Sequence, residues 1–371
     1  MGHIQKRSDR RYQARWIDDQ GRERAQTFTR KVDAERHIAK VEGDKLQGTY
    51  VDRSNAITVS EYAKQWAAAR PHRESTAART ATLIKTHIEA TRLGSRRLVE
   101  VRPSEVQAWA TERSRRLSPS TLRLVVGTLR SIFNAAVRDR LVAHNPVVGL
   151  SLPRHERERV VPLTVAQVRE LADAMPARAR AMVIAQAGLG LRLGELLALR
   201  FQDVDFLRRT ARIEWQTTID GKHRVPPKTP RSRRTVPLPA VVAEALAAHV
   251  AEFPPAADGG LFTTLHGHPW RHEYYGQRTF ARAVRVANLP AGTTTHDLRH
   301  HYASVLLAAG ESVVAVAERL GHENATLVLT TYGHLMPDSE DRTRRAIEIA
   351  WSDGQGTDGG DHPETSFLVR S

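Results

Sequence analysis

The run of apolar residues between Ser118 and Leu141 is the feature that most limits what this chain can fold into. Nine apolar side chains recur there at helical spacing: Leu122, Val125, Val126, Leu129, Ile132, Phe133, Ala136, Val137 and Leu141. This period predicts one long amphipathic helix. We expect it to begin at Ser118-Pro119-Ser120 and to end at Asn145-Pro146.

The region around this run, residues 57–150, is predicted to be a helical domain. The stretch Thr58-Val59-Ser60-Glu61 has the pattern of a capping box and opens another helix through EYAKQWAAA. The exposed face of the long helix carries Arg123, Arg130, Arg138 and Arg140. Such a charged face is usually only exposed to solvent. The competing interpretation is that it contacts the phosphates of a nucleic acid.

Residues 1–55 are predicted to form a separate unit with 13 Lys+Arg against 9 Asp+Glu, a net charge of +4. The runs RRYQARWID and RERAQTFT alternate in polarity around Asp19-Gln20-Gly21, which predicts a β-hairpin. The next stretch, KVDAERHIAKVEGDKLQG, predicts one helix that ends at Gly48. A small sheet backed by one helix can lay its strands in a DNA groove. A domain that contacts another protein is the alternative.

The remainder of the chain is predicted to hold a linker, a third unit and a tail. The segment SLPRHERERVVPLT is charged and proline-bearing, which is typical of a linker. Residues 160–350 are expected to contain helices, a short β region and more helices. The tail, residues 351–371, is rich in Gly, Asp and Ser and is predicted to be disordered until its apolar end, Phe367-Leu368-Val369, meets a surface. The fold class is therefore multidomain and mainly α, with small β elements.

The composition favours an anionic partner. The chain has 56 Lys+Arg against 41 Asp+Glu, a net charge of +15, which indicates nucleic acid unless the whole proteome is basic. It has no cysteine, which excludes disulfides, thiolate zinc sites and cysteine nucleophiles. No apolar stretch is long enough to span a membrane, and the N-terminus does not resemble a secretory signal. We expect an intracellular protein.

The third unit holds a first candidate for phosphate chemistry in AGLGLRLGELLALRFQDVD, residues 187–205. Arg192 and Glu195 are three residues apart, so they share one helical face and can form a hydrogen bond. An arginine braced by a carboxylate at a helix start is suited to bind phosphate. An ordinary surface ion pair is the alternative.

A second candidate is RVPPKTPRSRRTVPLP, residues 224–239. Two extended runs surround Thr229-Pro230-Arg231-Ser232, which predicts a hairpin with Lys228 near its tip. An amine in that position can enter a DNA groove and donate a proton. The alternative is a basic hairpin that only contacts the DNA backbone.

Two further segments bring histidines, an arginine and a tyrosine. TTTHDLRHHYASVLLAAG places His296 and Arg299 on one helical face, where one can handle a proton and the other can neutralise charge. A purely structural histidine is the alternative. LGHENATLVLTTYGHL carries Tyr332 between His322 and His334. The chain lacks an HExxH pair, and we predict no metal site.

Together these residue types suffice for phosphoryl transfer without a metal. Arginines can neutralise the charge that Mg²⁺ neutralises elsewhere. A tyrosine has an ordinary pKa of about 10 and becomes a good nucleophile only when a cationic pocket stabilises the phenolate. A leaving alkoxide needs a proton donor.

These segments in this order resemble the tyrosine recombinases, the phage integrase family. GLRLGELLALRFQDVD resembles the first arginine box, PPKTPRSRRTVPLP the lysine hairpin and HDLRHHYAS the His-x-x-Arg box. LGHENATLVLTTYGHL resembles the Leu-Gly-His box joined to the tyrosine box. The resemblance implies six catalytic residues, Arg192, Lys228, His296, Arg299, His322 and Tyr332. The stretch TLRSIFNAAVRDRLVAHNPV resembles the end of the helical core-binding domain.

The resemblance also implies roles for these residues. Tyr332 would attack the scissile phosphate, Arg192 and Arg299 would hold its oxygens, and Lys228 would protonate the leaving 5′-oxygen. His296 would accept or position the proton of Tyr332, and His322 would bind the phosphate. Glu195 would orient Arg192, while His334 and Leu335 are given no chemistry.

For the whole protein, the resemblance implies an integrase with an arm-type DNA-binding domain (1–55), a SAM-like core-binding domain (57–150) and a catalytic domain (160–350). Its expected partners are double-stranded DNA, three further copies of itself in a synaptic tetramer, and an accessory DNA-bending or direction-controlling protein. It would work on the bacterial nucleoid without cofactor, metal, ATP or membrane. The alternatives are a type IB topoisomerase-like relaxase and a catalytically silent DNA-binding regulator.

Overall fold

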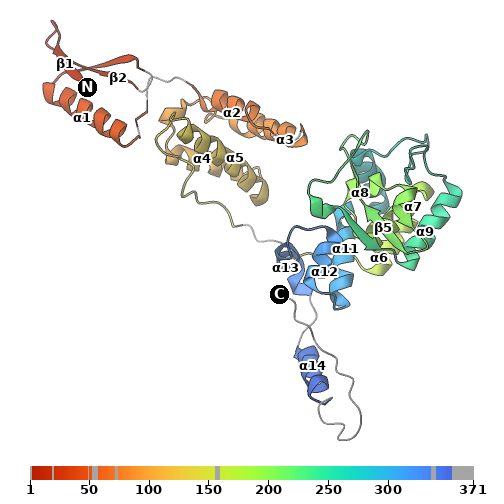
Figure 1. Ribbon diagram of the computed structural model, residues 1–371. Coiled ribbons are helices and arrows are strands. Elements are labelled where there is room, and N and C mark those ends of the chain that lie inside the picture. The colour runs from red at the N-terminus through yellow and green to blue at the C-terminus, as the bar shows by residue number, and fades with distance from the viewer. Residues whose placement is uncertain are drawn as a thin grey trace. The chain divides into compact units, whose positions relative to one another are not determined.

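The computed structural model describes residues 2–18, 21–48, 50–51, 57–71, 74–154, 159–335 and 340–352 of the 371-residue chain (Figure 1). The chain divides into two compact units, residues 1–157 and 158–371. The first unit contains two separate apolar cores, one between a small sheet and a helix and one among helices.

The first core belongs to a three-stranded antiparallel sheet that packs on one helix. The elements are β1 (His3–Lys6), β2 (Tyr12–Ile17), β3 (Glu23–Phe28) and α1 (Lys31–Leu46), and the strands lie in the order β1-β2-β3. Ala14 of β2 is buried against Ala34 and Ile38 of α1. The predicted strands and helix are confirmed, whereas Asp19 and Gln20 of the predicted turn lie outside the described residues. Strand β1 was missed because HIQK contains only one apolar residue.

The second core lies among the helices of residues 57–150. They are α2 (Val59–Ala68), α3 (Glu74–Ile84) with a π-helical continuation (Lys85–Glu89), a 3-10 turn (Leu98–Glu100), α4 (Pro103–Ser114) and α5 (Pro119–Arg138). The predicted capping box opens α2, since Thr58 Oγ1 accepts from the backbone N of Glu61 at 3.2 Å. The predicted apolar stripe supplies the buried face of α5, including Leu122, Leu129 and Phe133.

Helix α5 ends at Arg138, so the prediction that it continues to Asn145-Pro146 is wrong. Arg140 adopts a left-handed backbone with φ 56°, and the backbone N of Leu141 donates to Ala136 O at 2.9 Å. This reversal closes the helix end. Asn145 instead folds back on the helix, and its Nδ2 donates to Arg130 O at 3.1 Å.

The second unit is a helical domain that contains two small sheets. Its first half contains α6 (Val165–Asp173), α7 (Ala177–Leu189), α8 (Leu193–Ala198), a 3-10 turn (Phe201–Asp203), β4 (Val204–Asp205), β5 (Thr210–Ile213), β6 (Gln216–Thr217), β7 (Arg224–Val225), a 3-10 turn (Pro230–Ser232), β8 (Arg234–Pro237) and α9 (Ala240–Glu252). Its second half contains a π-helix (Tyr274–Phe280), α10 (Ala281–Val286), α11 (Thr295–Ala308), α12 (Val313–Leu320), α13 (Thr326–Tyr332) and a 3-10 turn (Gly333–Leu335). Helix α7 packs against α6, α9 and α11, and α12 packs against α11 and α13 (Figure 1).

The predicted hairpin around Lys228 is wrong, because the two runs that flank it do not pair with each other. Strand β7 pairs with β6, and β8 pairs with β5 in a sheet of order β4-β5-β8. Pro226, Pro227 and Pro230 lack the backbone N–H that a ladder between the two runs would need. Lys228 therefore lies in a loop that crosses from one sheet to the other.

Helix α14 (Glu340–Ser352) is the last described element, and it exposes Ile347, Ile349 and Trp351. Trp351 and Ser352 therefore belong to a helix and not to the predicted tail. The rest of the predicted tail, with Phe367-Leu368-Val369, lies outside the described residues.

Candidate active site

Arg192 lies where helix α7 gives way to helix α8. Helix α7 ends at Gly190 with φ 63°, and a Cβ there would lie 2.4 Å from Tyr302 Cδ1, so this turn requires glycine. Arg192 is then the N-cap of α8. Its Nη1 donates to Glu195 Oε1 at 2.8 Å, and its backbone N donates to Oε2 at 3.0 Å. The predicted Arg192–Glu195 bond is confirmed, and it fixes the direction of the guanidinium.

Glu195 also binds a second arginine, Arg234, which the sequence analysis did not single out. Arg234 Nη1 and Nη2 donate to Oε1 and Oε2 of Glu195 at 3.2 and 2.9 Å. Burial by itself raises the pKa of Glu195, but the positive charges of Arg234 and Arg192 outweigh burial and hold the pKa below its ordinary value. Glu195 is therefore an anion between two cations at neutral pH.

Arg299 of helix α11 is a third arginine of this cluster, and it is only 1% exposed. Its Nη1 donates to Gly190 O and its Nη2 to Leu320 O, each at 2.6 Å. Burial and the nearby charge of Arg192 lower its pKa to about 9, which still leaves it protonated at neutral pH. Three arginines and one carboxylate give the cluster a net positive charge, which suits an anion such as a phosphate.

Tyr332, the last residue of helix α13, contacts His300 and not His296. Its hydroxyl lies 2.6 Å from His300 Nδ1, and the two rings are 5.4 Å apart. Tyr332 is 2% exposed, and burial raises its pKa to about 12 although the charge of Arg299 acts in the opposite direction. His300 was missed by the sequence analysis. Its spacing of four from His296 was the available signal, because such residues share one helical face.

His296 and His322 are both neutral imidazoles at pH 7. Their pKa values are lowered to about 4, first by loss of hydration and further by the charge of Arg299. The ring of His296 lies edge-on to His300 at 4.6 Å. His322 follows helix α12, and its Nδ1 is buried without a hydrogen-bond partner within the part of the chain that the structure describes. Both rings can therefore exchange hydrogen bonds with a ligand without carrying charge.

The structure thus joins Arg192, Arg299 and Tyr332 with His300 in one cluster. Helix α11 supplies His296, Arg299 and His300, and its neighbours supply the rest. Lys228 lies exposed in the loop between β7 and the 3-10 turn. Its role at the phosphate stays a prediction.

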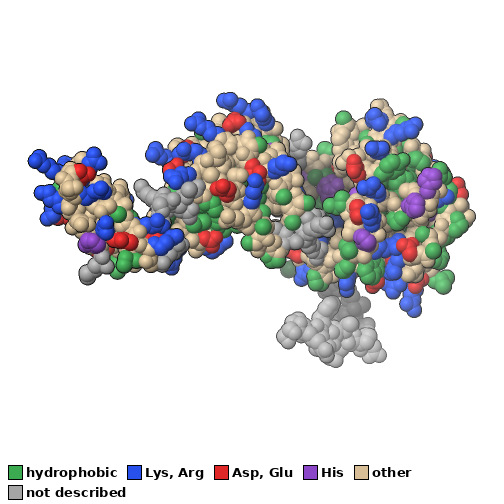
Figure 2. Space-filling model, turned by 90° about the horizontal axis from the view of Figure 1, so that it is seen from above, with side chains coloured by type: hydrophobic (Ala, Val, Ile, Leu, Met, Phe, Trp, Pro, Cys, Tyr) green, Lys and Arg blue, Asp and Glu red, His purple; other side chains and the backbone are tan. Residues whose placement is uncertain are grey.

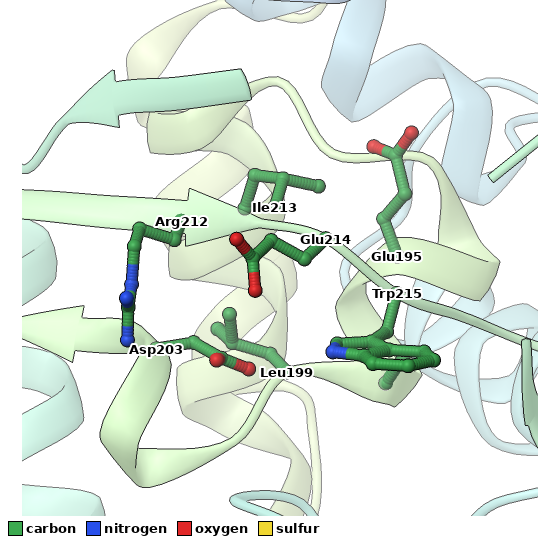
Figure 3. A pocket seen from close by; sticks show the side chains of 8 residues that line it. Glu195, Leu199, Asp203, Arg212, Ile213, Glu214 and Trp215 are labelled. Carbon is green, nitrogen blue, oxygen red and sulfur yellow. The ribbon is translucent and has the colours of Figure 1, made fainter. Parts of the chain in front are cut away.

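A small hollow beneath α8 is not the centre of this chemistry. Glu195, Asp203, Glu214 and Trp215 are among the residues that line it. Figure 3 shows the Glu195 carboxylate pointing away from the carboxylates of Asp203 and Glu214. The Glu195 carboxylate therefore binds the arginine cluster and does not face the other two acids.

The described surface is rich in basic side chains (Figure 2). Figure 2 shows Lys and Arg side chains spread over the face that it draws. Within the described ranges, no three His, Asp or Glu side chains come together as ligands for a metal ion. None of the helices in those ranges combines the length and apolar character needed to cross a bilayer.

A tyrosine hydroxyl beside buried arginines and neutral histidines, on a mainly helical domain, has the groups that a tyrosine-dependent phosphoryl transfer needs. Residues 162–338, which span this whole cluster, match the family model described as the phage integrase family. Residues 162–338 belong to this family, which confirms the resemblance, and the chain is a site-specific tyrosine recombinase.

Relatives match beyond the catalytic segment. The chain is 28% identical over 346 residues to a protein described as a prophage phiRv2 integrase of Mycobacterium tuberculosis, an alignment that covers 89% of this chain and 90% of the relative. It is 28% identical to the integrase of Mycobacterium phage L5, with 88% and 92% covered. A solved structure of the Tn1549 transposon integrase in complex with a circular intermediate DNA aligns with a TM-score of 0.69 and 26% identity, covering 79% of this chain and 99% of that one. The multidomain, mainly α fold is confirmed.

Proposed function

We propose that this recombinase is the integrase of a phage or another mobile element, and that it cuts and rejoins double-stranded DNA through a covalent bond to Tyr332. The observation that carries the proposal is the 2.6 Å contact between the Tyr332 hydroxyl and His300 Nδ1, beside the buried Arg299. DNA as the partner is supported by the transposon integrase relative, whose structure contains DNA.

The first step is an exchange at phosphorus. The Tyr332 oxygen bonds to the scissile phosphorus while the bond from phosphorus to the 5′-oxygen breaks. The tyrosine proton passes to His300 Nδ1, and Lys228 donates a proton to the leaving 5′-oxygen. The products are a 3′-phosphotyrosyl bond and a free 5′-hydroxyl. Rejoining reverses the step with another 5′-hydroxyl, and because one phosphodiester replaces another, no ATP is consumed.

The assignment of His300 changes the expectation from the sequence, in which His296 received or positioned this proton. His300 carries the hydroxyl contact, and His296 lies edge-on to it at 4.6 Å. We therefore give His296 the positioning role. Burial keeps the pKa of His300 below its ordinary value, so its ring is neutral and able to accept a proton at pH 7.

The charge that develops on the phosphate is neutralised by arginines. Arg192 and Arg299 bind the non-bridging oxygens, and Glu195 orients Arg192. His322 donates or accepts one further hydrogen bond through its buried Nδ1, which otherwise has no partner among the described residues.

Cleavage requires Tyr332 to be uncovered. Tyr332 is 2% exposed, so its hydroxyl cannot meet a DNA phosphate while the ring stays covered. Binding of DNA must open a path from the phosphate to the hydroxyl while the hydroxyl keeps its contact with His300, which receives the proton.

The remaining regions and partners follow from this assignment. Residues 1–55 would bind accessory DNA sites as an arm-type domain, and residues 57–150 would clamp the core site together with the catalytic domain, residues 160–350. Four copies would assemble on two DNA sites, with an accessory DNA-bending or direction-controlling protein, on the bacterial nucleoid. The net charge of +15 supports binding that weakens steeply with salt.

Covalent trapping tests the proposed function. The full-length chain is incubated with a pool of nicked duplexes with randomised cores, and protein–DNA adducts that survive denaturing electrophoresis are counted. Wild type should form the adduct and Tyr332→Phe should not, although both bind DNA. Tyr302→Phe, a buried tyrosine of the same apolar cluster, serves as the matched control and should still react. An adduct with Tyr332→Phe would contradict the proposal, and relaxation of any supercoiled DNA by single molecules would favour the relaxase.

A further inference from the structure

We infer that Arg234 is a positioning residue that holds three of the proposed catalytic segments in register. It reaches Arg192 through Glu195, the His322 turn through the end of helix α12, and the Lys228 loop through Ser232. This inference rests on the proposed function, because it concerns how residues of that same site are held in place.

The contact with Glu195 is the first of the three. Arg234 binds both carboxylate oxygens, at 3.2 and 2.9 Å, while Arg192 Nη1 binds one of them at 2.8 Å. The side chains of Arg234 and Glu195 are 6% and 2% exposed. Without Arg234, Glu195 would keep its bonds from Arg192 Nη1 and backbone N but lose the partner that fixes the plane of its carboxylate. The Arg192 guanidinium would then be held less firmly in one direction.

The second contact reaches the turn that carries His322. Arg234 Nε donates to Arg319 O at 2.7 Å, at the end of helix α12. The next turn residue, Gly321, has φ 64°, and a Cβ there would lie 3.1 Å from Arg234 Nη1. The guanidinium thus packs directly under the backbone that sets the direction of the His322 ring.

The third contact reaches the loop that carries Lys228. Arg234 Nη1 also donates to Ser232 O at 3.0 Å, and Ser232 Oγ lies 3.0 Å from Thr229 Oγ1. Arg231 of the same loop donates to the backbone oxygen of Glu323, beyond His322. The base of the Lys228 loop and the His322 turn are therefore fastened to each other around Arg234.

The number of N–H donors that Arg234 already uses indicates a positioning role and not direct contact with the phosphate. A guanidinium has five N–H donors, and these four bonds occupy four of them: Nε to Arg319 O, Nη1 to Glu195 Oε1 and Ser232 O, and Nη2 to Glu195 Oε2. A lysine would keep the charge but not this planar fork, so it could not hold all three segments.

The experiment compares Arg234→Ala and Arg234→Lys with Arg200→Ala in the full-length chain. Arg200 is the matched control because it also pairs with a buried acid, Asp203, at 2.9 Å. For each variant, the single-turnover rate of adduct formation is measured at saturating protein on nicked duplexes with randomised cores, below the unfolding temperature. DNA affinity is measured in parallel by gel shift.

We expect Arg234→Ala to lower the rate of adduct formation by about 100-fold and Arg234→Lys to lower it by at least about tenfold. The DNA affinity of both variants should stay within about threefold of wild type, because misplaced catalytic groups slow the reaction more than they weaken binding. Arg200→Ala should react within about threefold of wild type. A wild-type rate in either Arg234 variant, or an equal loss in Arg200→Ala, would overturn the inference while leaving the proposed function intact. Absence of any adduct with wild type would overturn both.

Discussion

The same local arrangement occurs twice around helix α8, but only one copy belongs to the active site. Arg192 is the N-cap of α8 and pairs with Glu195, and Arg200 is the N-cap of the next 3-10 turn and pairs with Asp203. Both acids are 2% exposed, and both accept a bond from the backbone N of their arginine.

The two pairs differ in how many donors the arginine gives to its acid. Arg200 binds Asp203 with Nε at 3.0 Å and Nη2 at 2.9 Å, which closes the pair on itself. The Arg192 side chain gives Glu195 only Nη1, while its Nη2 donates to Gly321 O at 3.2 Å and Arg234 binds the same carboxylate. The side chain of Arg192 stays 38% exposed, against 22% for Arg200. The pair that shares its acid with a second arginine is thus the more open of the two.

Removal of each arginine should give the largest difference between the two pairs. Arg192→Ala should slow adduct formation by about 100- to 1,000-fold, the usual loss when one preorganised donor to a reacting oxyanion is removed. Arg200→Ala should lower stability but leave the rate of the folded protein within about threefold, since Arg200 pairs with Asp203, whose carboxylate points away from that of Glu195 (Figure 3). Single-turnover trapping measures both, and equal losses would remove the distinction.

Removal of each acid should give the next largest difference, now in stability. Glu195→Ala leaves Arg234 buried without its carboxylate, which should cost about 3–5 kcal/mol of unfolding free energy. Asp203→Ala leaves Arg200, whose side chain is 22% exposed and can be hydrated, so about 1–2 kcal/mol is expected. Urea unfolding of the catalytic unit within the full-length chain measures both values. A larger cost for Asp203→Ala would contradict the role given to Arg234.

The smallest expected effect is on the dependence of stability on pH. The folded pKa of Glu195 lies below its ordinary value of 4.5, so its contribution is fully present above about pH 4.5 and is lost as pH falls through the folded pKa. Glu195→Gln removes this carboxylate. The unfolding free energy of Glu195→Gln should therefore fall less steeply between pH 5 and pH 3 than that of wild type, by at most about 1.4 kcal/mol per pH unit. If the unfolding free energies of wild type and Glu195→Gln fell equally with pH, Glu195 would not be held as an anion by its arginines.

The sequence predicts the contacts that form between residues a few positions apart in the chain. The spacing of Arg192 and Glu195 predicts their bond, and the same holds for the capping box at Thr58 and the stripe of α5. Arg234 was missed because it meets Glu195 from 39 positions away, on a strand whose pairing the spacing does not encode. His300 was missed for the same reason, since Tyr332 lies 32 positions from it.

The wrong predictions have local physical causes. The Lys228 hairpin was read from two extended runs, but prolines between them remove the donors of a shared ladder. The end of α5 was placed at Asn145-Pro146 because no glycine or proline marks Arg140, whose left-handed φ of 56° reverses the chain. A non-glycine residue in that conformation gives no signal in the sequence.

The central claim is that Tyr332 is the residue that bonds to DNA. The most direct measurement is peptide mapping of the trapped adduct by mass spectrometry after nuclease and protease digestion. We predict a nucleotide joined through its 3′-phosphate to the peptide that contains Tyr332. A nucleotide on any other residue, such as Tyr302, or a 5′-phosphate linkage, would contradict it.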